Sequence, residues 1–101
     1  MSRVYIGRCR SYAQDEVELA IRQAISALGG MERFVQPGQR VLLKPNLLSF
    51  KPPETAINTH PAVVQAVAGL VREVGAHAII DDSPGGGTGY NVRGLRRLYK
   101  V

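Results

Sequence analysis

Two segments of the chain repeat the same spacing of apolar residues, and this repetition most constrains the fold. In each segment the apolar positions fall at i, i+4, i+7, i+8 and i+11, which places them along one face of a helix. They are Val17, Ile21, Ala24, Ile25 and Leu28 in the first segment, and Val63, Val67, Leu70, Val71 and Val74 in the second. Glycines follow both stripes, as is typical just past a helix end. The sequence therefore predicts two matched amphipathic helices.

Short apolar runs alternate with these helices, and each has the length of a strand. The runs are residues 3–7, 40–44 and 77–81. The centre of the second run is uninterruptedly apolar, which is typical of a parallel strand covered on both faces. Residues 90–101 have the pattern of a third helix, with Val92, Leu95 and Leu98 on one side. This order predicts the α/β class: a three-layer, Rossmann-like β-α-β-α-β-α unit with a short parallel sheet.

The size of the chain predicts one α/β domain over residues 1–101. A sheet of three strands has two open edges, and the chain stops inside a predicted helix. We therefore expect an incomplete domain, the N-terminal part of a larger one, that needs its missing C-terminal region or self-association. No apolar run approaches the roughly 20 residues of a membrane span, and a strand-like run begins too early for a signal peptide. These features predict a cytoplasmic protein without membrane contact.

Three polar clusters stand where predicted strands end or a predicted helix begins. They are Lys44-Pro45-Asn46, Thr59-His60-Pro61 and Asp81-Asp82-Ser83-Pro84-Gly85-Gly86-Gly87. In open parallel sheets, ligands bind at the carboxyl edge, where the strands end. A helix that runs antiparallel to the strands begins at the same edge, so the clusters should meet there, with residues 47–58 as a covering lid. The sequence predicts a ligand site made of Lys44, Asn46, Thr59, His60, Asp81, Asp82, Ser83, Gly85, Gly86 and Gly87.

The chemistry of the first and third clusters favours an anion. Lys44 is a point charge suited to a phosphate or carboxylate, although a lysine at a strand end can also simply reach water. Asn46 can present an amide to the ligand or serve as a turn residue. The glycines at 85–87 can expose backbone N–H groups, but they lack both the dinucleotide fingerprint and the P-loop lysine. A flexible loop is the alternative for that segment.

His60 and the adjacent aspartates are the candidates for proton or metal chemistry. His60 precedes Pro61 and should lie at the helix boundary, where a neutral imidazole can bind a metal, polarise a carbonyl or merely cap the helix. Side chains of adjacent residues diverge in an extended chain, so Asp81 and Asp82 should not act as one pair. The catalytic candidates are Lys44, His60 and Asp82, and the metal candidates are His60 and Asp82. The sequence leaves open whether the protein is an enzyme.

The cysteine count and the distribution of charge limit the cofactors and partners that this chain is expected to bind. Cys9, between two arginines, is the single cysteine, so no iron–sulfur cluster can be held within this chain. The formal net charge is +5, but four of the 13 basic residues fall among the last twelve positions, where there is no acid. They are Arg93, Arg96, Arg97 and Lys100. This distribution favours one solvated helix face over a nucleic-acid surface, which would spread over a face of the fold.

Four blocks of sequence, in this order and spacing, resemble the domain of unknown function 362 family. They are Val41-Leu42-Leu43-Lys44-Pro45-Asn46-Leu47, Thr59-His60-Pro61-Ala62-Val63-Val64, Gly75-Ala76 and Asp81-Asp82-Ser83-Pro84-Gly85-Gly86. The resemblance covers most of residues 1–90. It implies a longer protein, since members typically exceed this length, and some members carry ferredoxin-like 4Fe–4S segments. With Cys9 alone, this chain departs from that pattern, so an iron–sulfur role would belong to sequence beyond it.

The leading interpretation is a domain of a larger enzyme or iron–sulfur redox protein that binds an anionic small molecule, with a metal as a further expectation. One alternative is a non-catalytic scaffold or protein-interaction domain, whose conspicuous residues are caps and turns. A weaker alternative is nucleic-acid binding through the basic residues at 93–100. Clustering of Lys44, His60 and Asp82 in one cleft would favour the first interpretation over the second.

Overall fold

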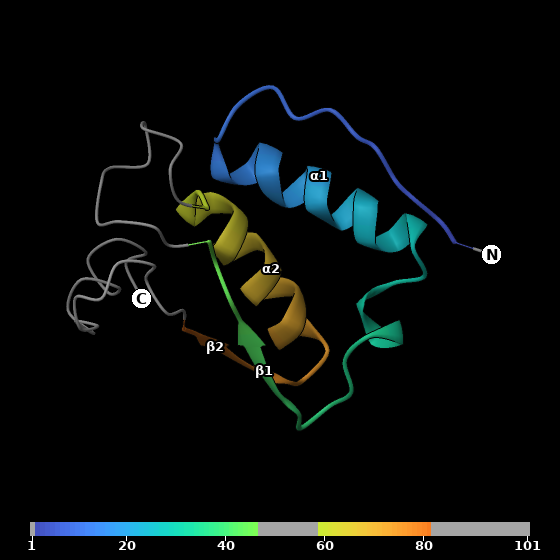
Figure 1. Cartoon of the computed structure of the whole chain (residues 1–101), viewed down its shortest axis with the longest axis vertical. Coiled ribbons are helices and arrows are strands. Elements are labelled where there is room, and N and C mark those ends of the chain that lie inside the picture. Colours follow the sequence, from blue (N-terminus) through green and yellow to red (C-terminus); the bar gives the residue numbers. More distant parts are fainter. Residues whose placement is uncertain (1, 47–58, 82–101) are drawn as a thin grey trace.

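The computed structural model describes residues 2–46 and 59–81. In order along this part of the chain, the elements are α1 (Gln14–Ala27), the 3₁₀ turn η1 (Met31–Arg33), β1 (Arg40–Leu43), α2 (Pro61–Glu73) and β2 (His77–Ile80). Figure 1 shows them in three levels, with α1 on one side of α2 and the two strands on the other. The described residues therefore form a small α/β unit in which α2 is the central element.

Helix α1 forms where the first apolar stripe predicts it. Asp15 and Glu16 occupy its first turn, where negative charge complements the helix dipole. At its other end Gly29 and Gly30 adopt φ values of 112° and 86°, which residues with a side chain rarely adopt. These two glycines turn the chain away from the helix axis, as the sequence predicts.

Helix α2 follows the second stripe but is buried on more sides than that stripe predicts. On one side Ala62 and Ala66 pack against Val17 of α1. On the other side Val71, which is 1% exposed, packs with Val35 and Ala76 close to the strands. A helix that lies between a second helix and a sheet must be apolar on two sides. This position explains the burial of Val64, Ala66 and Ala68, which are outside the predicted stripe.

Strands β1 and β2 pair in parallel, which confirms the pairing predicted for runs 40–44 and 77–81. The register joins Arg40 to His77 and Leu43 to Ile80. Burial alternates along both strands, because alternate side chains of a strand point to opposite faces. Val41, Leu43 and Ala78 pack toward α2. The opposite face is exposed in the described part of the chain.

The prediction of a strand at residues 3–7 is wrong. These residues have neither helix nor strand structure, and the N-terminal segment runs along the outer side of α1 (Figure 1). Val4 and Ile6 are 85% and 90% exposed. The alternation of two apolar residues fits a strand, but α1 packs on α2 and not on the sheet, so the segment before it emerges away from β1. The predicted third helix, residues 90–101, lies outside the described residues.

Candidate functional site at the carboxyl edge of the sheet

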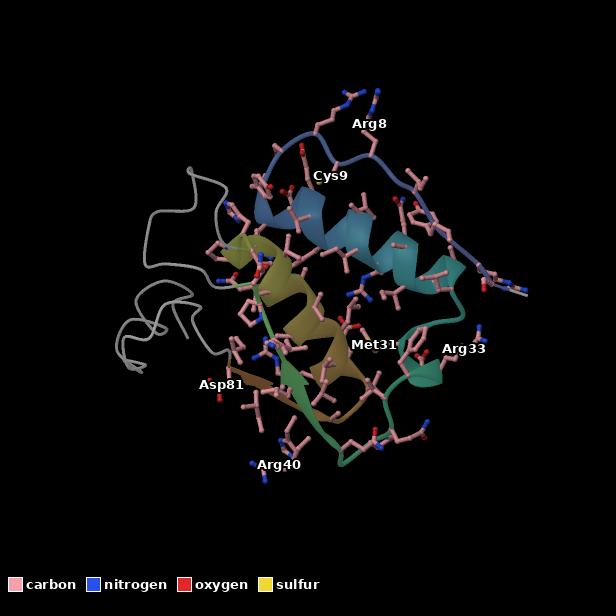
Figure 2. The ribbon with its side chains drawn as sticks, in the orientation of Figure 1. Arg8, Cys9, Met31, Arg33, Arg40 and Asp81 are labelled. Carbon is pink, nitrogen blue, oxygen red and sulfur yellow. The ribbon has the colours of Figure 1, made fainter. Side chains whose placement is uncertain are left out.

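The carboxyl ends of the two strands are held side by side. The Asp81 N–H donates a hydrogen bond of 3.1 Å to the Leu43 carbonyl, so the pairing continues one step beyond β2. Lys44 follows Leu43 directly, and both Lys44 and Asp81 are exposed. Figure 2 shows Asp81 at this end of β2. The backbone thus brings a cation and an anion of the candidate set to the same edge of the sheet.

Asn46 and Thr59 join the two ends of segment 47–58. The Asn46 N–H donates to the Thr59 hydroxyl oxygen at 2.8 Å. In return the Thr59 N–H donates to the Asn46 carbonyl at 3.0 Å. We call this reciprocal pair the Asn46–Thr59 clamp. It fixes the residue before His60 next to the exit of β1, so the first two polar clusters meet as the sequence predicts.

His60 caps the helix that it precedes. Its backbone is extended, with φ −64° and ψ 137°, and its Nδ1 accepts a 3.1 Å hydrogen bond from the Ala62 N–H. An imidazole nitrogen that accepts a bond carries no proton. In the neutral ring the proton therefore lies on Nε2, which can donate a hydrogen bond to a ligand. The capping role, one of the alternatives that the sequence leaves open, is the one observed.

The first N–H groups of α2 are already bonded. Pro61 has none, Ala62 donates to the His60 ring, and Val63 donates to the His60 carbonyl at 3.0 Å. A helix N-terminus binds an anion through N–H groups that lack a partner inside the helix. The start of α2 therefore offers no such N–H group at Ala62 or Val63. The glycines at 85–87, the backbone donors that the sequence predicts, lie outside the described residues.

Sequence reasoning missed two residues that position His60. The Tyr12 ring stacks on the His60 ring, with centroids 3.9 Å apart and 5° between the planes. The Gln14 side-chain amide donates to the Ala62 carbonyl at 3.1 Å. Tyr12 precedes α1 and Gln14 begins it, and each is 48 positions from its partner. An aromatic residue next to a helix start was the only sequence signal, and it names no partner.

Other candidate residues stay untested predictions. Asp82, Ser83, Gly85, Gly86 and Gly87 lie outside the described residues, as does the predicted lid at 47–58. Among residues 2–46 and 59–81, no three histidine, cysteine or acidic side chains come together in a metal-binding group. The choice of His60 and Asp82 as metal candidates therefore stays a prediction.

Cys9 takes no part in this edge. It is exposed, and its thiol donates a 3.2 Å hydrogen bond to the Ser11 carbonyl. Residues 9–12 line an apolar groove of about 400 Å³ together with Val17 and Ile21 of α1 and Val63 of α2. Of the site residues that the structure describes, Tyr12 is the one that also lines this groove. The groove is thus a separate feature, next to the stack of Tyr12 on His60.

No helix in the described ranges is long and apolar enough to span a bilayer.

Comparison with known proteins places this edge in a family. The profile of the family described as Domain of unknown function (DUF362) matches residues 41–100. Over 85 residues the chain is 45% identical to a thylakoid-associated protein of Synechocystis sp.. That alignment covers 84% of this chain but 26% of the relative, so the chain spans about a quarter of the relative's length. No solved structure matches. The matched range contains β1 except for Arg40, all of α2 and β2, and all of the predicted site residues, and the chain belongs to the DUF362 family.

Proposed function

We propose that the carboxyl edge of this sheet binds an anionic small molecule that bears a phosphate or a carboxylate. The observation that carries the proposal is the convergence of Lys44, Asn46, His60 and Asp81 on one edge. The Asp81–Leu43 hydrogen bond and the Asn46–Thr59 clamp support this convergence. Ligands of open parallel sheets bind at this edge, beyond the ends of the strands. Further strands in the longer protein would extend the pair into a Rossmann-like sheet.

Each polar group has a role that follows from its chemistry. Lys44 supplies the charge that attracts the anion, and its ammonium can donate three hydrogen bonds. The His60 ring donates from Nε2 while Nδ1 caps the helix. The Asn46 side-chain amide can donate to the same ligand. Because the first N–H groups of α2 are used, the glycines at 85–87 supply the backbone donors.

The two aspartates favour a further cation at the site, in addition to Lys44. A carboxylate beside a bound anion raises the energy of the complex unless a positive charge or a ligand hydroxyl lies between them. A divalent cation held by the Asp82 carboxylate would bridge to the ligand, since such ions prefer oxygen ligands. His60 then acts as a hydrogen-bond donor, because binding a metal through Nε2 would move its proton to Nδ1 and remove the helix cap.

Lys44→Ala tests this function, with Arg40→Ala as the matched control. Both residues are exposed cations that flank the apolar run of β1, but Arg40 lies at the opposite end of the strand. The probes are inorganic phosphate, pyrophosphate and citrate, with and without Mg²⁺, in calorimetric titrations. Loss of a charge-assisted contact of about 1.5–3 kcal/mol weakens binding about 10- to 150-fold. Equal binding by Lys44→Ala and the parent, or equal losses in both variants, would refute the site.

The wider role extends beyond this chain. We place the anion site in a larger enzyme or iron–sulfur redox protein of the cytoplasm, in which the cluster ligands come from sequence outside residues 1–101. The relative in Synechocystis is thylakoid-associated by name, so fractionation of cells that express the full-length protein is the direct check of location. Recovery of the protein with membranes after a high-salt wash would contradict the cytoplasmic assignment.

A scaffold or interaction role is the second candidate, and one observation favours it. Leu42 and Ile79 are exposed register partners on the sheet face opposite α2. Apolar pairs of this kind are normally covered by another element or by a partner. The nucleic-acid alternative depends on residues 93–100, which lie outside the described ranges. A steep fall of DNA affinity with salt would be its signature.

A further inference from the structure

The orientation of the His60 ring depends on two contacts of different kinds. The first is the 3.1 Å hydrogen bond that the Ala62 N–H donates to Nδ1. This bond holds Nδ1 in place but fixes the ring plane only loosely, since the terminal torsion of a histidine has a broad energy minimum. The direction of Nε2, on the far side of the ring, is therefore not determined by the cap alone.

The second contact holds the plane of the ring. Tyr12 lies against His60 with 3.9 Å between the ring centroids and 5° between the planes. Faces in contact at this spacing resist tilting, because a tilt overlaps atoms on one side and opens a gap on the other. With Nδ1 held by the cap and the plane held by Tyr12, the direction of the Nε2–H donor is defined.

Tyr12 is itself held by the turn that leads into α1. The Ser11 hydroxyl accepts a 3.1 Å hydrogen bond from the Ala13 N–H and donates one of 2.7 Å to the Glu16 carboxylate. These two bonds tie the residues on either side of Tyr12 to each other and to the first turn of the helix. The position of the Tyr12 ring thus follows the position of α1.

The start of α1 is joined in turn to the start of α2. The Gln14 side-chain amide donates a 3.1 Å hydrogen bond to the Ala62 carbonyl, and Val17 packs against Ala62 and Ala66. Figure 1 shows the first turns of the two helices side by side. Tyr12 therefore approaches His60 from an element that is anchored on the same helical turn that His60 caps.

The exposure of Tyr12 shows that its ring is not a core residue. The residue is 60% exposed, and it belongs to neither of the two clusters of buried apolar residues in the described part of the chain. An aromatic ring that stays largely in water contributes little burial energy. Its contact with His60 is what an aromatic side chain at this position supplies.

We propose that Tyr12 is a positioning residue of the anion site and acts through His60. The inference rests on the proposed function of the carboxyl edge and deepens it. Tyr12 holds the Nε2–H donor in the direction from which the ligand oxygen is bound, so the ligand does not have to immobilise the ring itself. The site is then completed by a segment that lies outside residues 41–100, the range matched by the family profile.

Tyr12→Leu tests the inference in calorimetric titrations with inorganic phosphate, pyrophosphate and citrate. This variant keeps an apolar side chain but should bind about 2- to 10-fold more weakly than the parent, because the ligand must then order the His60 ring. Tyr12→Phe restores the stacking face and should bind as the parent does. The matched control is Phe34→Leu, the same kind of change at a ring that follows η1 and is 57% exposed. It should leave binding unchanged.

A second background separates positioning from a loss of structure. His60→Asn keeps a helix cap but has no ring, so Tyr12→Leu should have no further effect on binding in this background. A purely structural defect would weaken binding in both backgrounds. In the ligand-free protein, NMR should show the His60 ring protons shifted upfield by the stacked ring, and this shift should be lost in Tyr12→Leu. Circular dichroism confirms that each variant is folded.

The outcomes distinguish the inference from the function on which it rests. Unchanged binding by Tyr12→Leu, or equal weakening in the two backgrounds, would overturn the inference and leave the anion site standing. A parent protein that binds none of the three probes would overturn the proposed function and this inference with it, even where the ring-proton shifts confirm the stack.

Discussion

The Tyr12 ring lies parallel to the His60 imidazole, with 3.9 Å between the ring centroids. The stack joins Tyr12, in the coil before α1, to His60, the N-cap residue of α2, which lies 48 positions later in the sequence. The hydrogen bond from Gln14 to the Ala62 carbonyl holds the same two helix ends together. His60 is thus fixed both by its own helix and by a neighbouring element, and its Nε2 atom has a defined position at the carboxyl edge.

Removing the stack should destabilise the fold moderately. Tyr12→Ala is expected to lower the free energy of unfolding by about 0.5–1.5 kcal/mol through loss of the ring pair. Tyr12→Phe keeps a ring against the imidazole and should retain most of the stability. Urea unfolding followed by circular dichroism measures both variants. Equal losses in the two would show that the hydroxyl, and not the ring, is what matters.

Replacement of His60 should separate its cap from its stack. His60→Ala removes both, and loss of an N-cap alone costs about 0.5–2 kcal/mol. Asparagine is a good N-cap residue without an aromatic ring, so His60→Asn should have an intermediate free energy of unfolding. The same urea titrations rank the three proteins. A His60→Asn protein as unstable as His60→Ala would mean that the Nδ1 hydrogen bond contributes little.

Core truncation should distinguish the packed centre from the N-terminal segment. Val71→Ala removes two methyl groups from a side chain that is 1% exposed, at a cost of about 1.5–3 kcal/mol. Val4→Ala makes the same chemical change at a side chain that is 85% exposed, so the urea midpoint should hardly move. A large fall of the urea midpoint in Val4→Ala would show that Val4 is packed, as the strand predicted for residues 3–7 requires.

The ion pair between α1 and α2 should make stability depend on acid pH. Arg22 binds Glu73 through two hydrogen bonds, of 2.9 and 2.6 Å, and the hydrogen bond from Arg22 holds the pKa of Glu73 below its ordinary value. The pair therefore stabilises the fold above the pKa of the unfolded carboxyl, and this contribution is lost as the pH falls through the lower folded value.

Glu73→Gln is the variant that tests this pH dependence. Both side chains are half-exposed, so the effect should be small and weakened by salt. Urea midpoints from neutral pH to below about pH 4 should fall less steeply in Glu73→Gln than in the parent. Parallel curves at low salt would show that the pair contributes nothing measurable.

The local pattern of apolar residues predicted the two helices and the two strands that are joined by a single helix. The stripes beginning at Val17 and Val63 specify helices because a period of 3.6 fits one apolar face, and the runs at 40–44 and 77–81 pair through the helix that joins them. The run containing Val4 and Ile6 has the right alternation, but pairing also requires an adjacent strand. In the structure that segment runs along α1, which is separated from the strands by α2 (Figure 1).

The residues of the candidate site could also be predicted only where local pattern decides their position. Lys44 and Asp81 could be placed together because parallel strands share a carboxyl edge, and His60 could be placed at a helix start because it precedes Pro61. The stack with Tyr12 could not be predicted, since it arises from the packing of two helices that are distant in sequence. Burial on two sides of α2 was missed for the same reason.

The Asn46–Thr59 clamp makes the geometry of the carboxyl edge independent of the length of segment 47–58. Both bonds are made by residues outside the segment, so the exit of β1 and the start of α2 keep their spacing whatever connects them. The entropic cost of closing a loop rises by only about 0.6 kcal/mol for each doubling of its length. Insertions or deletions between the two clamp residues should therefore be tolerated, and this connection is a place where family members can diverge without moving Lys44 relative to His60.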